Sequence, residues 1–223
     1  MWELRPELIG LTPAQRLFHC PRPIIGLTGG MGCGKSTALA CLQEYAITLS
    51  ADALIKKIYA LPATITFLQE VLPEAVHATT SPATINWEVL RTQFLAQKSL
   101  AQKIENYLYA QLPAMFNQEL ATAAASHHPS TAIVFEVPLL FECHWDTIVD
   151  QTIAVVASTT VQAQRLTTQR QLPPSTREAF LKRQLPLAAK AAQANFTIKN
   201  DGSLAELHQQ CHALAAQLFC PLV

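Results

Sequence analysis

Residues 29–36 have the types and spacing that can hold a polyphosphate. They read GGMGCGKS and match the pattern G-x-x-x-x-G-K-[ST]. A loop whose backbone N–H groups all point at one anion needs glycine where the chain is crowded or φ is positive. Lys35 can bridge the β- and γ-phosphates of a nucleotide, and the Ser36 hydroxyl can ligate Mg²⁺. The segment therefore predicts a nucleotide-binding site, although a loop of this kind does not specify the reaction.

The distribution of glycine along the chain supports this prediction. Five of the seven glycines lie within residues 23–42. Residues 23–27 are typical of a buried strand, and a helix is expected to begin near Lys35, where its N-terminal dipole favours an anion. A chance glycine turn is the alternative, and the coincidence of pattern, strand and helix argues against it. The predicted ATP-binding residues of the loop are Gly30, Gly32, Cys33, Gly34, Lys35, Ser36 and Thr37.

The aspartates of the chain argue against one large class of nucleotide-binding proteins. Regulatory GTPases need D-x-x-G and N-K-x-D, but none of the four aspartates is followed by glycine at the third place, and N-K-x-D is absent. A small-molecule kinase fits a chain of 223 residues better. Two alternatives stay open: a kinase of another small alcohol or nucleotide, and a nucleotide-binding protein that has lost catalysis.

Asp52 is the second candidate for chemistry. It stands just past the second predicted strand, and the carboxyl ends of parallel strands line the ligand crevice. A carboxylate there can orient a substrate hydroxyl and accept its proton. The alternative is an N-cap for a helix starting at Ala53. Position alone does not decide between these two interpretations.

Short apolar segments separated by helical stretches must position these residues. Strands without strict alternation, joined through helices, predict a parallel sheet covered on both faces. The expected fold class is therefore α/β, a P-loop NTPase with a five-stranded parallel sheet flanked by helices. The expected strands are residues 23–27, 45–50, 131–137, 151–157 and 195–200.

The domain organisation follows from the segments between the strands. Residues 64–126 show no convincing strand and are helical in composition, which predicts a helical substrate-binding insertion at about 61–127. A basic stretch at about 160–190 predicts a helical lid. The expected arrangement is one kinase domain over residues 23–220, with its core at 23–60 and 128–220. Residues 1–22 form an N-terminal extension, in which a short helix is expected after Thr12-Pro13.

The amino-acid composition limits the partners and the cellular compartments that are expected for the protein. The formal net charge is zero, which argues against nucleic acid as a partner. No uncharged apolar run reaches the roughly 18 residues of a membrane span, and the charged N-terminus is unlike a signal peptide. The six cysteines form no CxxC pair, so we expect reduced thiols in a cytoplasmic protein.

Several motifs in order along the chain resemble the dephospho-CoA kinase family. The segments are GLTGGMGCGKST at the loop, SADALI after the second strand, LRTQF with Arg91, VPLLFE at 137–142, and a strand followed by glutamine and arginines. Their order and spacing hold from about residue 23 to about residue 215. The resemblance implies transfer of the ATP γ-phosphoryl group to the ribose 3′-hydroxyl of dephospho-CoA. No obligate protein partner is evident from the sequence.

The same resemblance implies roles for individual residues. Asp52 matches the catalytic carboxylate, and Glu136 matches an acid that would hold Mg²⁺ through water; its alternative is a strand-end acid without a metal role. Arg165 and Arg170 match lid arginines over ATP, with solvated helix arginines as the alternative. The implied substrate-binding residues are Asp52, Lys56, Arg91 and Tyr109.

The chain departs from the family pattern at a few positions. Ser50 stands where an additional acid is frequent, Lys56 replaces an arginine, Tyr109-Ala110 replaces a His-Pro, and Asn195 replaces an acid. The lid arginines are also spaced one residue wider than expected.

Cys33 lies in the loop beside Lys35 and a predicted helix N-terminus, which both favour a thiolate. We hypothesise that thiol reagents inactivate the protein unless ATP protects it; the alternative is a small residue in the usual place of serine.

Overall fold

The computed structural model describes residues 1–77, 84–169 and 182–222. Contacts divide the chain into two compact units. The first comprises Met1–Ala51 and Leu120–Val223, and the second comprises Asp52–Glu119. The sequence analysis proposed a helical insertion at about 61–127, a range that overlaps most of this second unit.

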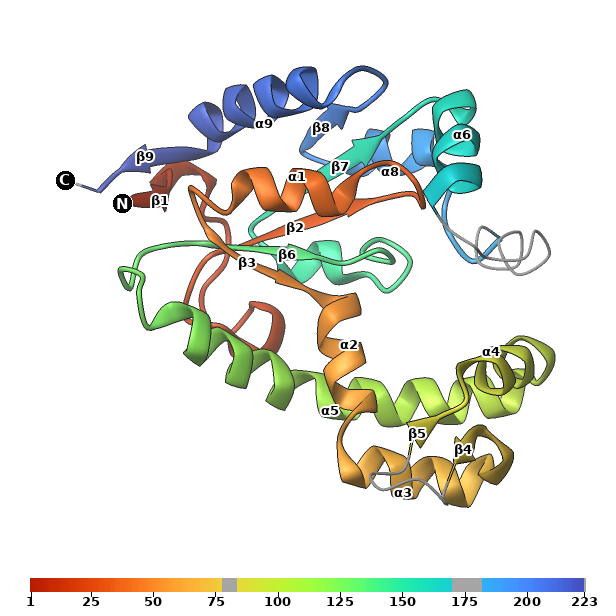
Figure 1. The fold of residues 1–223 in the computed structure, drawn as a ribbon. Helices are drawn as coiled ribbons and strands as arrows, with labels where there is room; N and C mark the ends of the chain where they lie inside the picture. The colour runs from red at the N-terminus through yellow and green to blue at the C-terminus, as the bar shows by residue number, and fades with distance from the viewer. Residues whose placement is uncertain (78–83, 170–181, 223) are drawn as a thin grey trace. The chain divides into compact units, whose positions relative to one another are not determined.

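The first unit is built on a five-stranded sheet in the order β3-β6-β2-β7-β8, and every neighbouring pair is parallel (Figure 1). This confirms the predicted fold class. The strands are β2 (Ile24–Gly29), β3 (Ile47–Ser50), β6 (Ile133–Glu136), β7 (Gln151–Val156) and β8 (Phe196–Lys199). The register sets Glu136 beside both Leu27 and Ser50, so the carboxyl ends of three strands meet there.

The central strand β2 shows why the sheet must be covered on both faces. All six of its residues are buried. Ile25 and Leu27 belong to a core cluster that includes the apolar sides of α1 (Lys35–Leu42) and α9 (Leu204–Leu218), which lie side by side in Figure 1. Gly26 points to the opposite face, since side chains alternate along a strand. A Cβ at Gly26 would lie 2.8 Å from a methyl carbon of Leu140, so that face is closely packed as well.

Helix α9 shows how local sequence sets an element of this unit. Its N-cap is Ser203, whose hydroxyl accepts from the backbone of Glu206 while the Glu206 carboxylate accepts from the backbone of Ser203. Its buried residues recur at helical spacing and form one apolar stripe against the sheet. Other helical elements of the unit include α6 (Thr159–Gln169), α8 (Leu187–Gln193) and the 3₁₀ turn η4 (Trp145–Ile148).

The N-terminal segment belongs to the first unit. Strand β1 (Trp2–Leu4) pairs antiparallel with β9 (Phe219–Pro221), so the two ends of the chain form a small sheet. The α-helix expected after Thr12-Pro13 does not form; a turn at residues 13–15 and the 3₁₀ element η2 (Leu17–His19) stand there, and a further 3₁₀ element, η1 (Pro6–Leu8), precedes them.

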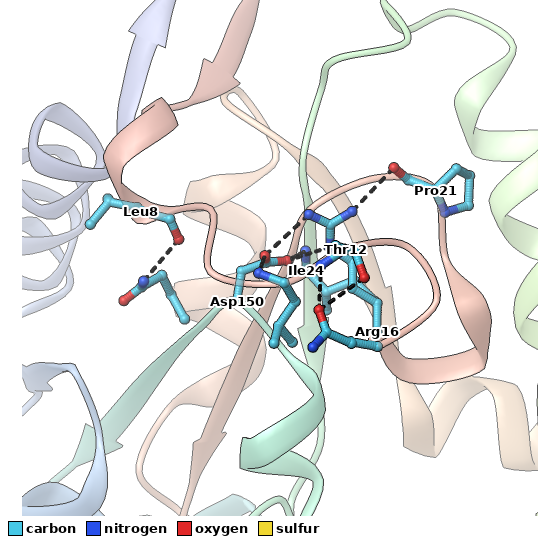
Figure 2. A network of polar contacts seen from close by, with 9 residues as sticks. Leu8, Thr12, Arg16, Pro21, Ile24 and Asp150 are labelled. Atoms are coloured by element: carbon cyan, nitrogen blue, oxygen red, sulfur yellow. Dashed lines mark hydrogen bonds and ion pairs between the residues drawn. The ribbon is translucent and has the colours of Figure 1, made fainter.

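A buried carboxylate fixes this segment to the sheet. Asp150, directly before β7, accepts from the guanidinium of Arg16 at 2.7 and 3.2 Å (Figure 2). It also accepts from the backbone N–H groups of Leu11 and Ile24 at 3.0 and 2.9 Å. Four donors therefore satisfy one buried charge, and they come from the N-terminal segment and the start of β2.

The second unit is mainly helical, as the sequence predicted. Its helices are α2 (Ala51–Tyr59, whose first residue belongs to the first unit), α3 (Pro62–Val71), α4 (Trp87–Ala96) and α5 (Lys98–Ala124), with the 3₁₀ turn η3 (Pro73–Ala75). The rings of Phe67 and Tyr107 stack between α3 and α5, with centroids 4.0 Å apart. The expectation of no strand was wrong: β4 (Val76–His77) pairs with β5 (Thr84–Ile85), and two-residue strands are too short to show a period.

Candidate active site

The loop between β2 and α1 has the backbone that its glycines predict. Gly34 is the N-cap of α1 and adopts φ +87°, a left-handed conformation that favours glycine. A Cβ at this position would also lie 2.2 Å from Asn200 Nδ2. Glycine is therefore required twice, by conformation and by a close neighbour. The helix starts at Lys35, so its positive dipole end faces the loop.

Lys35 and Glu136 come together at the carboxyl ends of β2 and β6. The Lys35 ammonium donates to Gly30 O at 3.1 Å, and it lies 4.0 Å from Glu136 Oε1. Glu136 is buried, and the Ser50 hydroxyl donates to its Oε2 at 2.5 Å. The site thus has a cation for phosphate oxygens and, beside it, a carboxylate held in one orientation from the end of β3.

The Ser36 hydroxyl and the Glu136 carboxylate are suited to a hard divalent cation whose other ligands are water and phosphate oxygens. Mg²⁺ prefers oxygen donors and is usually held by one or two protein groups together with substrate phosphates. Ser36 is exposed in the first turn of α1, and Glu136 supplies a carboxylate at the neighbouring strand end. The part of the chain that the structure describes contains no cluster of three or more His, Cys, Asp or Glu residues suited to a metal.

Two side-chain amides contact the outer side of the loop, and the sequence analysis missed both. Gln162 Nε2 on α6 donates to Met31 O at 2.8 Å and to the Cys33 sulfur at 3.2 Å. Asn200, just after β8, donates from Nδ2 to Cys33 O at 2.8 Å. Gln162 lies in the predicted motif of a strand followed by glutamine and arginines, and Asn200 ends the predicted strand 195–200, but an isolated amide has no periodic pattern that assigns it a role.

Of the two predicted lid arginines, Arg165 lies within the residues that the structure describes and Arg170 does not. The Arg165 guanidinium donates to the backbone oxygen of Asn200 at 3.0 Å and to its side-chain oxygen at 3.3 Å. It lies near the loop, since a Cβ at Gly34 would be 4.0 Å from Arg165 Nη1. Arg170 lies outside the described residues.

Cys33 is not the activated thiol that its sequence position suggested. Its side chain is buried, and burial raises the pKa of the thiol despite the nearby Gly30 backbone, Lys35 and Arg165. Desolvation disfavours the thiolate more strongly than these groups favour it. Burial therefore favours the alternative, a small residue that fills space in the loop, over an activated thiolate.

The four candidate substrate-binding residues all belong to the second unit. Asp52 is exposed on the first turn of α2, and because that helix starts at Ala51, Asp52 lies inside the helix and is not its N-cap. Lys56 is exposed one turn further along the same helix. Arg91 is half-buried on α4, and Tyr109 is exposed on α5.

An ion pair between Lys190 and Glu142 anchors the end of the basic stretch, and the sequence analysis gave this pair no role. Lys190 on α8 is fully buried; its ammonium donates to Pro138 O at 2.6 Å and lies 2.9 Å from Glu142 Oε1. The same carboxylate oxygen accepts from the backbone of Leu185 at 2.7 Å. Glu142 closes the VPLLFE segment, so that motif serves to hold residues 185–190 against the chain after β6.

The central strand of the parallel sheet leads through this loop into a helix, and a carboxylate lies at the end of the neighbouring strand. Together these features define a P-loop phosphotransferase of the small-molecule kinase type. The family model for dephospho-CoA kinase matches residues 23–206. The chain therefore belongs to the dephospho-CoA kinase family. No helix in the described ranges is long and apolar enough to cross a bilayer.

Individual relatives agree with this assignment. The chain is 32% identical to dephospho-CoA kinase of Rhodopseudomonas palustris strain BisB18, over 86% of this chain and 94% of that protein. It is 30% identical to dephospho-CoA kinase of Lactiplantibacillus plantarum, over 81% and 90%. The crystal structure of TT1252 from Thermus thermophilus superposes with a TM-score of 0.74 at 25% identity, covering 88% of this chain and 97% of that one. Dephospho-CoA kinase from Campylobacter jejuni shares the fold, with a TM-score of 0.62 at 20% identity, covering 88% and 96%.

Proposed function

We propose that this protein phosphorylates the ribose 3′-hydroxyl of dephospho-CoA with ATP and releases coenzyme A and ADP. The observation that carries the proposal is the phosphate loop, with Lys35 set against Glu136, in a chain that matches the family from residue 23 to residue 206. Dephospho-CoA and ATP are the proposed partners. Neither nucleic acid nor an obligate protein partner is required. The six cysteines are free, which supports a reducing cytoplasmic location.

In the proposed reaction, the bond between the γ-phosphorus and the oxygen bridging it to ADP breaks while a bond to the 3′-oxygen forms. The proton of the 3′-hydroxyl passes to the Asp52 carboxylate. The transition state of phosphoryl transfer is loose, so this carboxylate mainly orients the hydroxyl in line and takes the proton late. The Lys35 ammonium stabilises charge on the β- and γ-phosphate oxygens, where the first turn of α1 adds its dipole.

The remaining candidate residues have binding roles in this proposal. Mg²⁺, when bound, would neutralise charge on the β- and γ-phosphates, and Ser36 with Glu136, the latter through water, would hold it. The backbone of Gly30, Gly32, Cys33 and Gly34 cradles phosphate, and Thr37 stands in the first turn of α1 beside Ser36. We assign Lys56, Arg91 and Tyr109 to dephospho-CoA, and Arg165 and Arg170 to ATP.

An acceptor screen tests the proposed function. ADP release is measured with ATP, Mg²⁺ and dephospho-CoA, and in parallel with AMP or shikimate as acceptor. We expect ADP to appear in step with coenzyme A only when dephospho-CoA is present. A Lys35→Ala preparation controls for contaminating kinases. Equal or faster release with another acceptor would assign the chain to a different substrate, and ATP binding without any turnover would identify an impaired homologue.

A further inference from the structure

The phosphate loop is held from outside by side chains that come from distant parts of the sequence. A loop that turns its N–H groups toward phosphate must turn carbonyl groups away, and these need donors of their own. Here Met31 O and Cys33 O each accept from a side-chain amide, at 2.8 Å in both cases. The donors, Gln162 and Asn200, lie 131 and 167 residues away from their acceptors in sequence.

The glycines of the loop are matched to these two amides. A Cβ at Gly30 would lie 2.9 Å from Gln162 Nε2, and one at Gly34 would lie 2.2 Å from Asn200 Nδ2. Both distances are shorter than real Cβ contacts, so any side chain there would push the amide away from its carbonyl. The loop therefore has glycine, which lacks a side chain, at the two positions where the amides approach it.

Other contacts fix the orientation of each amide. Asn200 is buried, and its side-chain oxygen accepts from Arg165 Nη2 at 3.3 Å, which leaves Nδ2 facing Cys33. Its backbone is held at both ends, since its N–H donates to Val156 O and its carbonyl accepts from Arg165 Nη1. Gln162 sits in the first half of α6, and its Nε2 also reaches the Cys33 sulfur at 3.2 Å.

We propose that Gln162 and Asn200 are positioning residues for the triphosphate of ATP. Their amides fix Met31 O and Cys33 O on the outer side of the loop, which keeps the N–H face preorganised for phosphate. This inference depends on one part of the proposed function, which is that the loop binds a triphosphate. It assigns to Arg165 a supporting role toward Asn200.

Two isosteric changes test the proposal. Gln162→Glu and Asn200→Asp keep the shape of the side chain but replace the donor with a carboxylate that faces a carbonyl and adds negative charge behind the phosphates. We expect each to weaken binding of ATP, and of inorganic tripolyphosphate as a probe of the loop alone, on the order of 10-fold or more. Arg165 remains to pair with the new carboxylate in Asn200→Asp, so the fold is retained.

Direct titration of ATP and tripolyphosphate, with Tm measured in parallel, gives the readout. Gln209→Glu, an exposed position on α9, introduces the same charge away from the loop and serves as the control. A positioning role raises both dissociation constants and the KM for ATP while the KM for dephospho-CoA changes little. Binding within about twofold of wild type for both variants, with the control unchanged, overturns the proposal.

A second variant keeps the test decisive if a charged replacement fails to fold. Gln162→Ala preserves helix propensity and removes only the amide, so we expect a folded protein with ATP binding weakened roughly 3- to 10-fold. Unchanged binding in folded Gln162→Ala overturns the role of that residue. Because these titrations contain no dephospho-CoA, a wild type that binds ATP but does not phosphorylate dephospho-CoA would overturn the proposed function and leave this inference standing.

Discussion

Ser50 and Glu136 are joined by a hydrogen bond between the ends of two neighbouring strands, with 2.5 Å between Ser50 Oγ and Glu136 Oε2. Ser50 is the last residue of β3 and Glu136 is the last residue of β6, and the two are paired in register. The hydroxyl donor and the carboxylate therefore meet at neighbouring strand ends. A second acid at Ser50 would place two like charges at this distance, whereas the hydroxyl orients Glu136 without repulsion.

Removing that hydroxyl should weaken the response to Mg²⁺. In Ser50→Ala the Glu136 carboxylate loses the donor that orients it, and loss of such an outer contact typically weakens metal binding by about 10- to 100-fold. The concentration of Mg²⁺ that gives half-maximal rate should rise accordingly, while ATP-free Tm changes little. Glu136→Gln should have the larger effect. A Mg²⁺ dependence equal to wild type in both variants would show that Glu136 has no metal role.

Lys35→Ala should abolish most of the activity. The ammonium that faces the β- and γ-phosphates is lost, and removal of one such electrostatic contact costs roughly 10²-fold or more in kcat. The loop should persist, because amide and backbone contacts hold it, so far-UV circular dichroism and Tm should stay near wild type. Activity within a few-fold of wild type in the ADP-release assay would remove Lys35 from the reaction.

The Arg16–Asp150 pair should dominate the contribution of the N-terminal segment to stability. Both side chains are buried, and breaking a buried pair by removing one partner costs about 3–5 kcal/mol because a charge is left uncompensated. Arg16→Met should therefore lower Tm by about 10 °C for a chain of this size. Arg5→Met is a suitable comparison, since Arg5 makes an exposed bond to Ala216 O and should shift Tm much less. Similar shifts in the two variants would contradict the assigned role of Asp150.

The thiol of Cys33 should react slowly with alkylating reagents. Burial raises the pKa of this thiol, so its thiolate is scarcer at pH 7–8 than in an exposed cysteine. Reactivity should rise only as the pH approaches the raised pKa or as the loop opens. Mass-spectrometric mapping of N-ethylmaleimide adducts at pH 7.5 should find partly exposed Cys143 and Cys220 modified before Cys33. Rapid modification of Cys33, blocked by ATP, would restore the thiolate hypothesis.

The features that the sequence predicted depend on residues close together in the chain, whereas the features that it missed depend on contacts between residues far apart in the chain. The five strands and the phosphate loop are local patterns, since a buried apolar run or a glycine spacing is visible within ten residues. The ties of Asp150 to Arg16, and of Asn200 to Cys33, join residues 134 and 167 positions apart and depend on the order of strands in the sheet. Burial of Cys33 likewise depends on α6 and on the chain after β8, so its local surroundings pointed to the wrong protonation state.

Asp52 provides the sharpest test of the proposed chemistry. Its carboxylate lies on the first turn of α2, so an N-cap role does not account for it. The 3′-hydroxyl of ribose is a very weak acid, and a carboxylate that orients it and accepts its proton late is worth about 10²- to 10⁴-fold in rate. Asp52→Asn keeps the size and loses the basicity, so kcat should fall within that range. Loss of the favourable charge near the helix N-terminus should cost only about 0.3–1 kcal/mol of stability.

Binding measurements separate a catalytic role of Asp52 from a general disturbance of the fold. ATP affinity of Asp52→Asn should match wild type, because the phosphate loop, Lys35 and Ser36 belong to the other unit and are unchanged. Lys57→Gln, an exposed position on the same helix that pairs with Glu119, controls for changes in α2 and should keep a nearly normal kcat. A normal kcat for Asp52→Asn with dephospho-CoA would place the catalytic carboxylate elsewhere, with Glu136 the next candidate, and the same kcat measurement on Glu136→Gln would then decide it.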